Sequence, residues 1–292
     1  MLGRIKIRVE IAKGKLERVK RRLEKIKDAS LGTDRNWAGM SVPEQRAYFA
    51  GLSASKQREF FDENGFLWVP NAMSAGDLAA VHRDVKTHGL VGTTEEIWAG
   101  PSFAPLIDNP KVLGALQSVL GQEVRFFKAA YVGTPPIRTP GMKPSRNTLH
   151  VDYGIGETID DWRNSCASWI NVGFYLSDLT AERSPFWVVP GSNRYYHVPP
   201  WTDMEYLGDD ARMVLAQAGD ALLFHCLTIH ATAANVSDEI REALFYSYRP
   251  GWARHIGPVK EWPQDFLDSL PEARRRLLVG LNQGSSAPRN TL

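Results

Sequence analysis

Two residue types that bind metals stand two positions apart near the middle of the chain, at His150 and Asp152. In an extended segment, residues i and i+2 point to the same side, so this imidazole and this carboxylate can face one point. Two protein ligands are too few for a metal site of useful affinity. A third ligand must therefore come from another part of the sequence.

The second informative stretch, Gly219–His230, opens with a turn signal, continues as an apolar strand and contains two histidines. His225 and His230 are five positions apart, so in a regular strand they face opposite sides and only one can join the first pair. We favour His230 because of the residues that follow it. Two histidines and one carboxylate on one face of an octahedron form the facial triad of non-haem iron(II) oxygenases. This arrangement leaves positions open for a chelating co-substrate and for O2.

A threonine and an arginine beyond His230 suggest what that co-substrate is. Thr232 lies on the same face as His230, and Arg241 follows a turn signal rich in Asn, Ser and Asp. We expect the next strand, Glu242–Arg249, to return antiparallel beside the first, so that Arg241 reaches back into the pocket. A guanidinium recognises a carboxylate through two hydrogen bonds, which a lysine cannot match. These residues predict a keto diacid held by the metal at one end and by Arg241 with Thr232 at the other.

Each of these features has an ordinary structural explanation when it is taken alone. A His-x-Asp pair is common in exposed polar loops, a buried histidine such as His230 usually bonds to the backbone, and an arginine near a turn is usually solvated. Their combination in this order and spacing favours a metal site over the separate explanations.

The elements that would position these residues are mainly strands after a short helical start. Short runs rich in β-branched and aromatic residues, punctuated by Gly, Pro, Asn and Asp, suggest a sandwich or jelly roll with supporting helices. The predicted strands are Phe66–Val69, Val124–Val132, Ser168–Ser177, Phe186–Pro190, Asp220–Ile229 and Glu242–Arg249, and the predicted helices are Ala75–Lys86 and Asp108–Leu120.

Composition excludes some classes of function. The chain has 292 residues, of which 43% are hydrophobic, enough to bury a sizeable core. Its net charge of +2 is too small to argue for nucleic acid, which leaves a small-molecule substrate as the expected partner. The excess positive charge lies in residues 1–28, which hold eleven Lys and Arg against four acidic residues.

In this basic arm, apolar residues recur at alternating spacings of three and four, which predicts an amphipathic helix. Three interpretations of the helix stay open: packing on its own domain, pairing with a second copy or another partner, and binding to a membrane surface. The oligomeric state is correspondingly monomer or dimer.

We divide the chain into an arm and connector (1–57), one catalytic domain (58–279) and a flexible tail (280–292) rich in small and polar residues. The two cysteines show no pattern that requires a disulfide, and no apolar run approaches the ~20 residues that span a bilayer. The sequence also shows no secretory signal, so we expect a cytoplasmic protein.

From residue 58 to 250 the sequence resembles the phytanoyl-CoA dioxygenase-like family of iron(II)/2-oxoglutarate oxygenases. The residues that carry the resemblance are Phe61–Phe66, Lys128, His150-x-Asp152, Trp169, Val189–Asn193, Gly219-Asp220 and the stretch from His230 through Asn235 to Arg241. The sequence departs from the family pattern at Val151, where a glutamine is frequent, at Ala181–Pro185, which replaces an Asn-Gly turn, and at Asn193, where a histidine is typical.

The resemblance implies a double-stranded β-helix (jelly-roll, cupin-like) core and iron(II) ligation by His150, Asp152 and His230. It implies that Arg241 with Thr232 binds the distal carboxylate of 2-oxoglutarate, that Lys128 touches this co-substrate, and that Trp169 lines the pocket. The expected reaction is hydroxylation of a C–H bond with O2 as the second co-substrate and with release of succinate and CO2. Two alternatives stay open: desaturation, epoxidation or cyclisation at the same site, and a non-catalytic jelly roll that binds a metal or ligand.

Overall fold

The computed structural model describes residues 13–21, 36–137, 149–152, 168–195, 210–253 and 262–279. The expected tail, 280–292, and most of the basic arm lie outside these ranges. Within the arm, residues 13–21 are helical, and Val19 is buried in a small apolar cluster that also contains Leu149 and Ile229.

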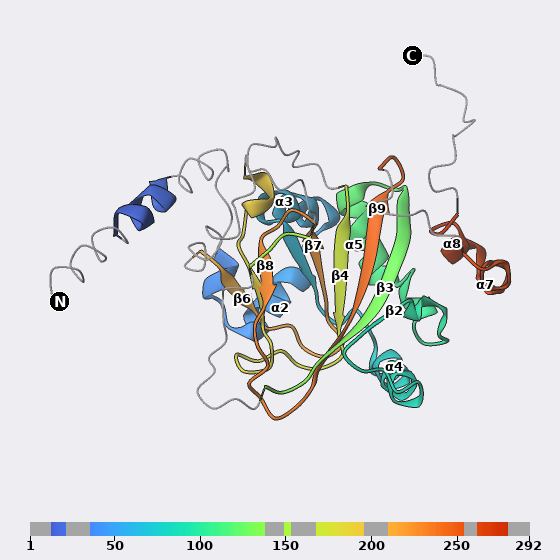
Figure 1. The fold of residues 1–292 in the computed structure, drawn as a ribbon. Helices are drawn as coiled ribbons and strands as arrows, with labels where there is room; N and C mark the ends of the chain where they lie inside the picture. The colour runs from blue at the N-terminus through green and yellow to red at the C-terminus, as the bar shows by residue number, and fades with distance from the viewer. Residues whose placement is uncertain are drawn as a thin grey trace, which may run out of the picture.

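The larger of two antiparallel sheets has six strands in the order β1-β7-β4-β9-β3-β2 (Figure 1). Neighbouring strands of this sheet are distant in sequence: the partners in the β3–β9 and β1–β7 pairs lie more than 100 residues apart. The strands are β1 (Phe66–Val69), β2 (Thr93–Glu95), β3 (Val124–Thr134), β4 (Ile170–Tyr175), β7 (Ala221–His225) and β9 (Arg241–Pro250).

The smaller sheet has three short strands in the order β6-β5-β8 and lies beside the larger one (Figure 1). They are β5 (Phe186–Val188), β6 (Arg212–Val214) and β8 (His230–Thr232). Aromatic rings join the two sheets, since the ring centres of Phe186 and Phe224 lie 5.2 Å apart. Two antiparallel sheets in contact, with helices beside them, confirm the predicted jelly-roll core with flanking helices.

Helices cover the other face of the larger sheet. Ser74 begins α4 with a capping box, in which its hydroxyl accepts from the Asp77 N–H and the Asp77 carboxylate accepts from the Ser74 N–H. The longer helices are α2 (Val42–Ala50), α3 (Ala54–Asn64), α4 (Ala75–Thr87) and α5 (Pro110–Leu120), and the short ones are η1 (Asn36–Gly39), η2 (Ile97–Ala99), η3 (Ala104–Leu106), η4 (Ser192–Arg194), α7 (Gln264–Ser269) and α8 (Glu272–Arg275). In the described part of the chain, no helix is both long and apolar enough to cross a membrane.

Two expectations about the strands were wrong. The predicted strand Asp220–Ile229 ends at His225, where the Thr228 N–H donates to the His225 carbonyl and closes a turn. The chain then crosses to the smaller sheet as β8. The following strand, β9, does not lie beside β7, because β4 pairs with both and separates them.

Candidate active site

Backbone hydrogen bonds bring the two stretches with potential metal ligands together. The His150 N–H donates to the His230 carbonyl (2.8 Å), and the His230 N–H donates to the His150 carbonyl (2.9 Å). This antiparallel bridge puts both imidazoles on one side. Two residues further on, Asp152 donates its N–H to the Cys226 carbonyl (3.0 Å) and returns to the same side. The backbone alone therefore aims three side chains from two distant stretches at one point.

The three side chains are close enough to share one ion. Asp152 Oδ1 lies 3.7 Å from His150 Nε2 and 3.6 Å from His230 Nε2. One atom from each residue can be chosen so that all three lie within 4.8 Å of one another. Metal–ligand bonds of about 2.1 Å let one ion touch two atoms that are up to about 4.2 Å apart. Both separations from Asp152 satisfy this limit.

His230 is held in the tautomer that a metal requires. Its Nδ1 lies 2.9 Å from the Thr228 carbonyl, which only accepts, so Nδ1 carries the proton and Nε2 presents a lone pair toward Asp152. The ring packs between Phe186 and Phe224, at centre-to-centre distances of 5.6 and 4.7 Å. Burial, the largest cause, lowers the pKa of His230 and favours the neutral ligand form.

Asn171 on β4 orients the carboxylate of Asp152. Its oxygen accepts from Trp169 Nε1 (2.9 Å) and Ser247 Oγ (2.6 Å), and its amide nitrogen donates to Asp152 Oδ2 (2.6 Å). An indole N–H can only donate, so the Asn171 atom that faces Trp169 must be the oxygen, and the nitrogen must face Asp152. Asp152 Oδ2 is thereby engaged, and Oδ1 is left facing the two histidines.

A cavity of about 320 Å³, which we call the central cavity, opens beside these ligands. Trp169 and Thr232, both expected at the site, line it. Lys128 also lines it but is paired with Glu95, with 2.8 Å between Nζ and Oε1. The remaining lining residues are Thr93, Glu95, Ala130, Val132, His150, Asp152, Asn171, Phe186, Phe224, His230, Phe245 and Ser247.

Arg241 is buried next to this cavity with only 1% of its surface exposed. Its guanidinium carbon lies 5.1 Å from the ring centre of Tyr175 and 5.5 Å from that of Phe245, which lines the cavity. Nε and Nη2 have no hydrogen-bond partner among the described residues. A buried guanidinium stays charged and costs several kcal/mol unless an anion compensates it. The side chain is therefore suited to a carboxylate that the described residues do not supply.

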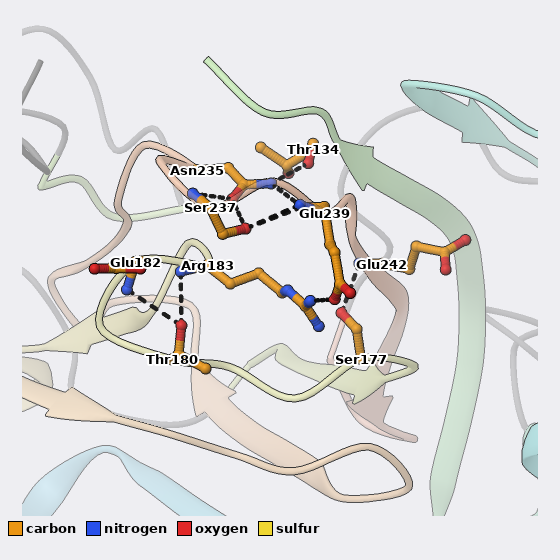
Figure 2. Close-up of polar contacts among 9 residues, drawn as sticks. All are labelled: Thr134, Ser177, Thr180, Glu182, Arg183, Asn235, Ser237, Glu239 and Glu242. Atoms are coloured by element: carbon orange, nitrogen blue, oxygen red, sulfur yellow. Dashed lines mark hydrogen bonds and ion pairs between the residues drawn. The ribbon is translucent and has the colours of Figure 1, made fainter. Parts of the chain in front are cut away.

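The loop before Arg241 is fixed by its own polar side chains (Figure 2). The Asn235 amide nitrogen donates to the Thr134 carbonyl (2.8 Å) and to the Glu239 carbonyl (2.7 Å), and its oxygen accepts from Ser237 Oγ (2.7 Å). Arg183 adds an ion pair with Glu239. These bonds set where β9 begins and hence where the Arg241 side chain enters the core.

His225 takes no part in the cluster. It is buried on β7, its Nδ1 accepts the Leu227 N–H (3.0 Å), and its ring lies near Phe61. The argument that strand parity lets only one of the two histidines join the cluster does not apply, because a turn rather than a regular strand separates them. Sequence reasoning also missed Asn171, although a polar residue inside the apolar run Ile170–Tyr175 is a signal of a buried bonding role.

The chain is similar in sequence to known dioxygenases. The sequence model of the family "Phytanoyl-CoA dioxygenase (PhyH)" matches residues 99–243. The peroxisomal phytanoyl-CoA dioxygenase of Rattus norvegicus is 24% identical over 259 residues, covering 73% of this chain and 74% of the relative. The ectoine dioxygenase of Bordetella bronchiseptica is 22% identical over 262 residues, covering 74% and 83%.

Solved structures show the same fold. EctD from S. alaskensis with bound iron aligns with a TM-score of 0.58 at 20% identity, covering 73% of this chain and 82% of that one. The epimerase SnoN, in complex with iron, alpha ketoglutarate and nogalamycin RO, aligns with a TM-score of 0.54 at 20% identity, covering 75% and 90%.

Fold, metal-binding cluster and relatives together define the chain as a 2-oxoglutarate-dependent non-haem iron dioxygenase. Within that class its sequence is similar to the phytanoyl-CoA dioxygenase (PhyH) family, whose model matches residues 99–243.

Proposed function

We propose that His150, Asp152 and His230 hold one iron(II) ion and that the enzyme hydroxylates a C–H bond of a small molecule, releasing succinate and CO2. The observation that carries this proposal is the convergence of the three ligand atoms, with Asp152 Oδ1 at 3.7 and 3.6 Å from the two imidazole nitrogens. The donor set, two imidazoles and one carboxylate, is the set that non-haem iron oxygenases use.

The proposed site for 2-oxoglutarate rests on Arg241. Its Nε and Nη2, which have no hydrogen-bond partner within the geometric limits among the described residues, lie on one edge of the guanidinium and can bind a carboxylate through two parallel hydrogen bonds. Thr232, which lines the central cavity two residues after His230, adds a hydroxyl on the same side. Lys128 is a further candidate contact and would exchange its bond with Glu95 for one with the co-substrate.

Iron(II) with 2-oxoglutarate and O2 supplies an oxidant strong enough to break an unactivated C–H bond. The chain's own residues do the remaining work. His150, Asp152 and His230 hold the metal, and Asn171 fixes the carboxylate orientation. The aromatic walls of the central cavity, Trp169 and Phe245 among them, exclude water and confine the substrate near the ligands.

The test compares two buried histidines, one inside the cluster and one outside it. Protein with iron(II), ascorbate and 2-oxoglutarate is assayed for succinate release, alone and with pools of small molecules, and iron binding is measured separately. We expect His230→Ala to weaken iron binding by more than about 100-fold, because loss of a ligand exceeds the ~10- to 100-fold effect of losing an outer partner. His225→Ala is the matched control and should bind iron within a few-fold of the unmodified protein.

Iron binding that survives His230→Ala but is lost in His225→Ala would contradict the ligand assignment. Bound iron without turnover in any pool would favour the non-catalytic alternative. The product separates the oxidative outcomes, because hydroxylation and epoxidation add an oxygen atom, whereas desaturation and ring closure remove two hydrogens.

A further inference from the structure

A second buried arginine, Arg249, lies on the cavity side of β9. Side chains alternate along a strand, so Arg249 shares a face with Phe245 and Ser247, both of which line the central cavity. Tyr246 and Tyr248 point the other way, where their hydroxyls donate to backbone carbonyls of the segment before α5. Arg249 is therefore the next residue beyond Ser247 on the inner face.

The strand register puts Arg249 next to a wall of the central cavity. Strands β4 and β9 pair Asn171 with Ser247 and Ile170 with Tyr248. One further step in this antiparallel register places Trp169, which lines the cavity, opposite Arg249. Cross-strand neighbours have Cβ atoms about 4.5–5.5 Å apart. Arg249 thus lies at the opposite end of β9 from Arg241, with Ser247 and Asn171 between them.

The guanidinium of Arg249 has unused hydrogen-bonding capacity. Only 1% of the residue is exposed, and Nη1 donates to the Ala253 carbonyl. Nε and Nη2 have no partner among the described residues. The same two nitrogens of Arg241 have no partner within hydrogen-bonding geometry among the described residues. In each arginine, Nε and Nη2 form the edge of the guanidinium that binds a carboxylate or phosphate through two parallel hydrogen bonds.

The surrounding charges favour an anion from outside the chain. Arg125 on β3 is the register partner of Arg249, which brings a second positive charge alongside. Glu123, two residues before Arg125, is already paired with Arg125 Nη2 at 2.9 Å. Burial is the main cause that lowers the pKa of Arg249, with Arg125 second, so the described residues offer Arg249 little anionic compensation.

We propose that Arg249 binds an acidic group, a carboxylate or a phosphate, of the substrate, so that this enzyme oxidises organic acids. Arg241 would hold the co-substrate at one end of β9, and Arg249 would hold the substrate at the other. Ser247, which lies between the two arginines on β9, donates to Asn171, and Asn171 donates to the metal-ligand candidate Asp152. These hydrogen bonds connect the middle of β9 to the proposed metal site. This inference rests on the proposed function, because it assigns the substrate end of the same site.

The test measures binding without turnover. Protein is saturated with Mn(II) and 2-oxoglutarate under argon, which occupies Arg241, and is then titrated calorimetrically with phenylacetate, phenylacetamide and phenyl phosphate. We expect an acid to bind about 10- to 100-fold more tightly than the neutral amide, as for hydrogen bonds to a charged group. Whichever acid binds more tightly identifies the oxyacid.

The variants test whether Arg249 causes that preference. Arg249→Gln should abolish the difference between acid and amide, and Arg249→Lys should retain part of it, because a lysine keeps the charge but loses the paired geometry. Arg58→Gln is the matched control, since Arg58 donates to the Ser118 carbonyl away from the cavity and should leave the preference intact. Thermal unfolding identifies any variant that fails to fold.

Equal binding of acid and amide by the unmodified protein would overturn the proposal without needing any variant. An acid preference that persists in Arg249→Gln would overturn it as well. So would the failure of every acid to bind a protein that does bind Mn(II) and 2-oxoglutarate. Failure to bind Mn(II) and 2-oxoglutarate at all would instead contradict the proposed function.

Discussion

Replacing Asn171 with alanine removes the one side-chain donor that the described residues supply to Asp152. The lost hydrogen bond, from Nδ2 to Oδ2 at 2.6 Å, is charge-assisted, and such bonds contribute about 1.5–3 kcal/mol. Outer partners of metal ligands affect affinity by about 10- to 100-fold, which corresponds to about 1.4–2.7 kcal/mol. The two ranges agree. Because the Asp152 side chain is 20% exposed, water can replace part of the lost bond, which places the expected effect at about 10- to 30-fold.

The assay is the dissociation constant of Fe(II), measured without oxygen by competition with a chelator. Ser247→Ala is the graded control, since it removes a donor to Asn171 Oδ1 but leaves the bond to Asp152. We expect it to change affinity by less than about 3-fold, because Trp169 Nε1 still fixes the amide orientation. Affinity within 2- to 3-fold of the unmodified protein for Asn171→Ala, at unchanged folding, would show that Asp152 does not depend on Asn171.

Three further predictions concern stability and the co-substrate. In urea melts, Gly65→Ala should lower the free energy of unfolding by more than about 1 kcal/mol, because φ is +77° and the new Cβ would lie 2.2 Å from Thr228 Oγ1. The control Gly114→Ala, inside α5, should raise the free energy of unfolding by about 0.5–1 kcal/mol. Asp220→Ala should cost about 3–5 kcal/mol in the same melts, because it leaves the Arg46 guanidinium without its buried partner; a loss below 1 kcal/mol would contradict this. Arg241→Leu should weaken 2-oxoglutarate binding by at least about 10-fold in calorimetry while Mn(II) affinity stays within a few-fold, and equal losses of both would contradict a role confined to the co-substrate.

Much of the fold was predictable because the local patterns are strong. Short apolar runs bounded by Gly and Pro located most of the strands, and Ser74 with Asp77 carried the capping box that begins α4. Within 219–230, the predicted strand Asp220–Ile229 was too long, because an apolar turn has the same composition as an apolar strand. Nothing in the residues before Thr228 signals that its N–H and its hydroxyl would bond to His225 and Gly65 and reverse the chain.

By itself, the sequence determined which side chains are available for chemistry: a His-x-Asp pair, a later histidine, and an arginine placed to bind a carboxylate. Only the tertiary structure decided how they meet. Backbone bonds between residues 150 and 230, 80 positions apart, set which histidine faces Asp152. The burial of Arg241 and Arg249 and the contact from Asn171 to Asp152 likewise depend on strands that pair across long stretches of chain. Spacing within one segment can predict a shared face, but contacts between segments follow from sheet register, which short-range patterns do not specify.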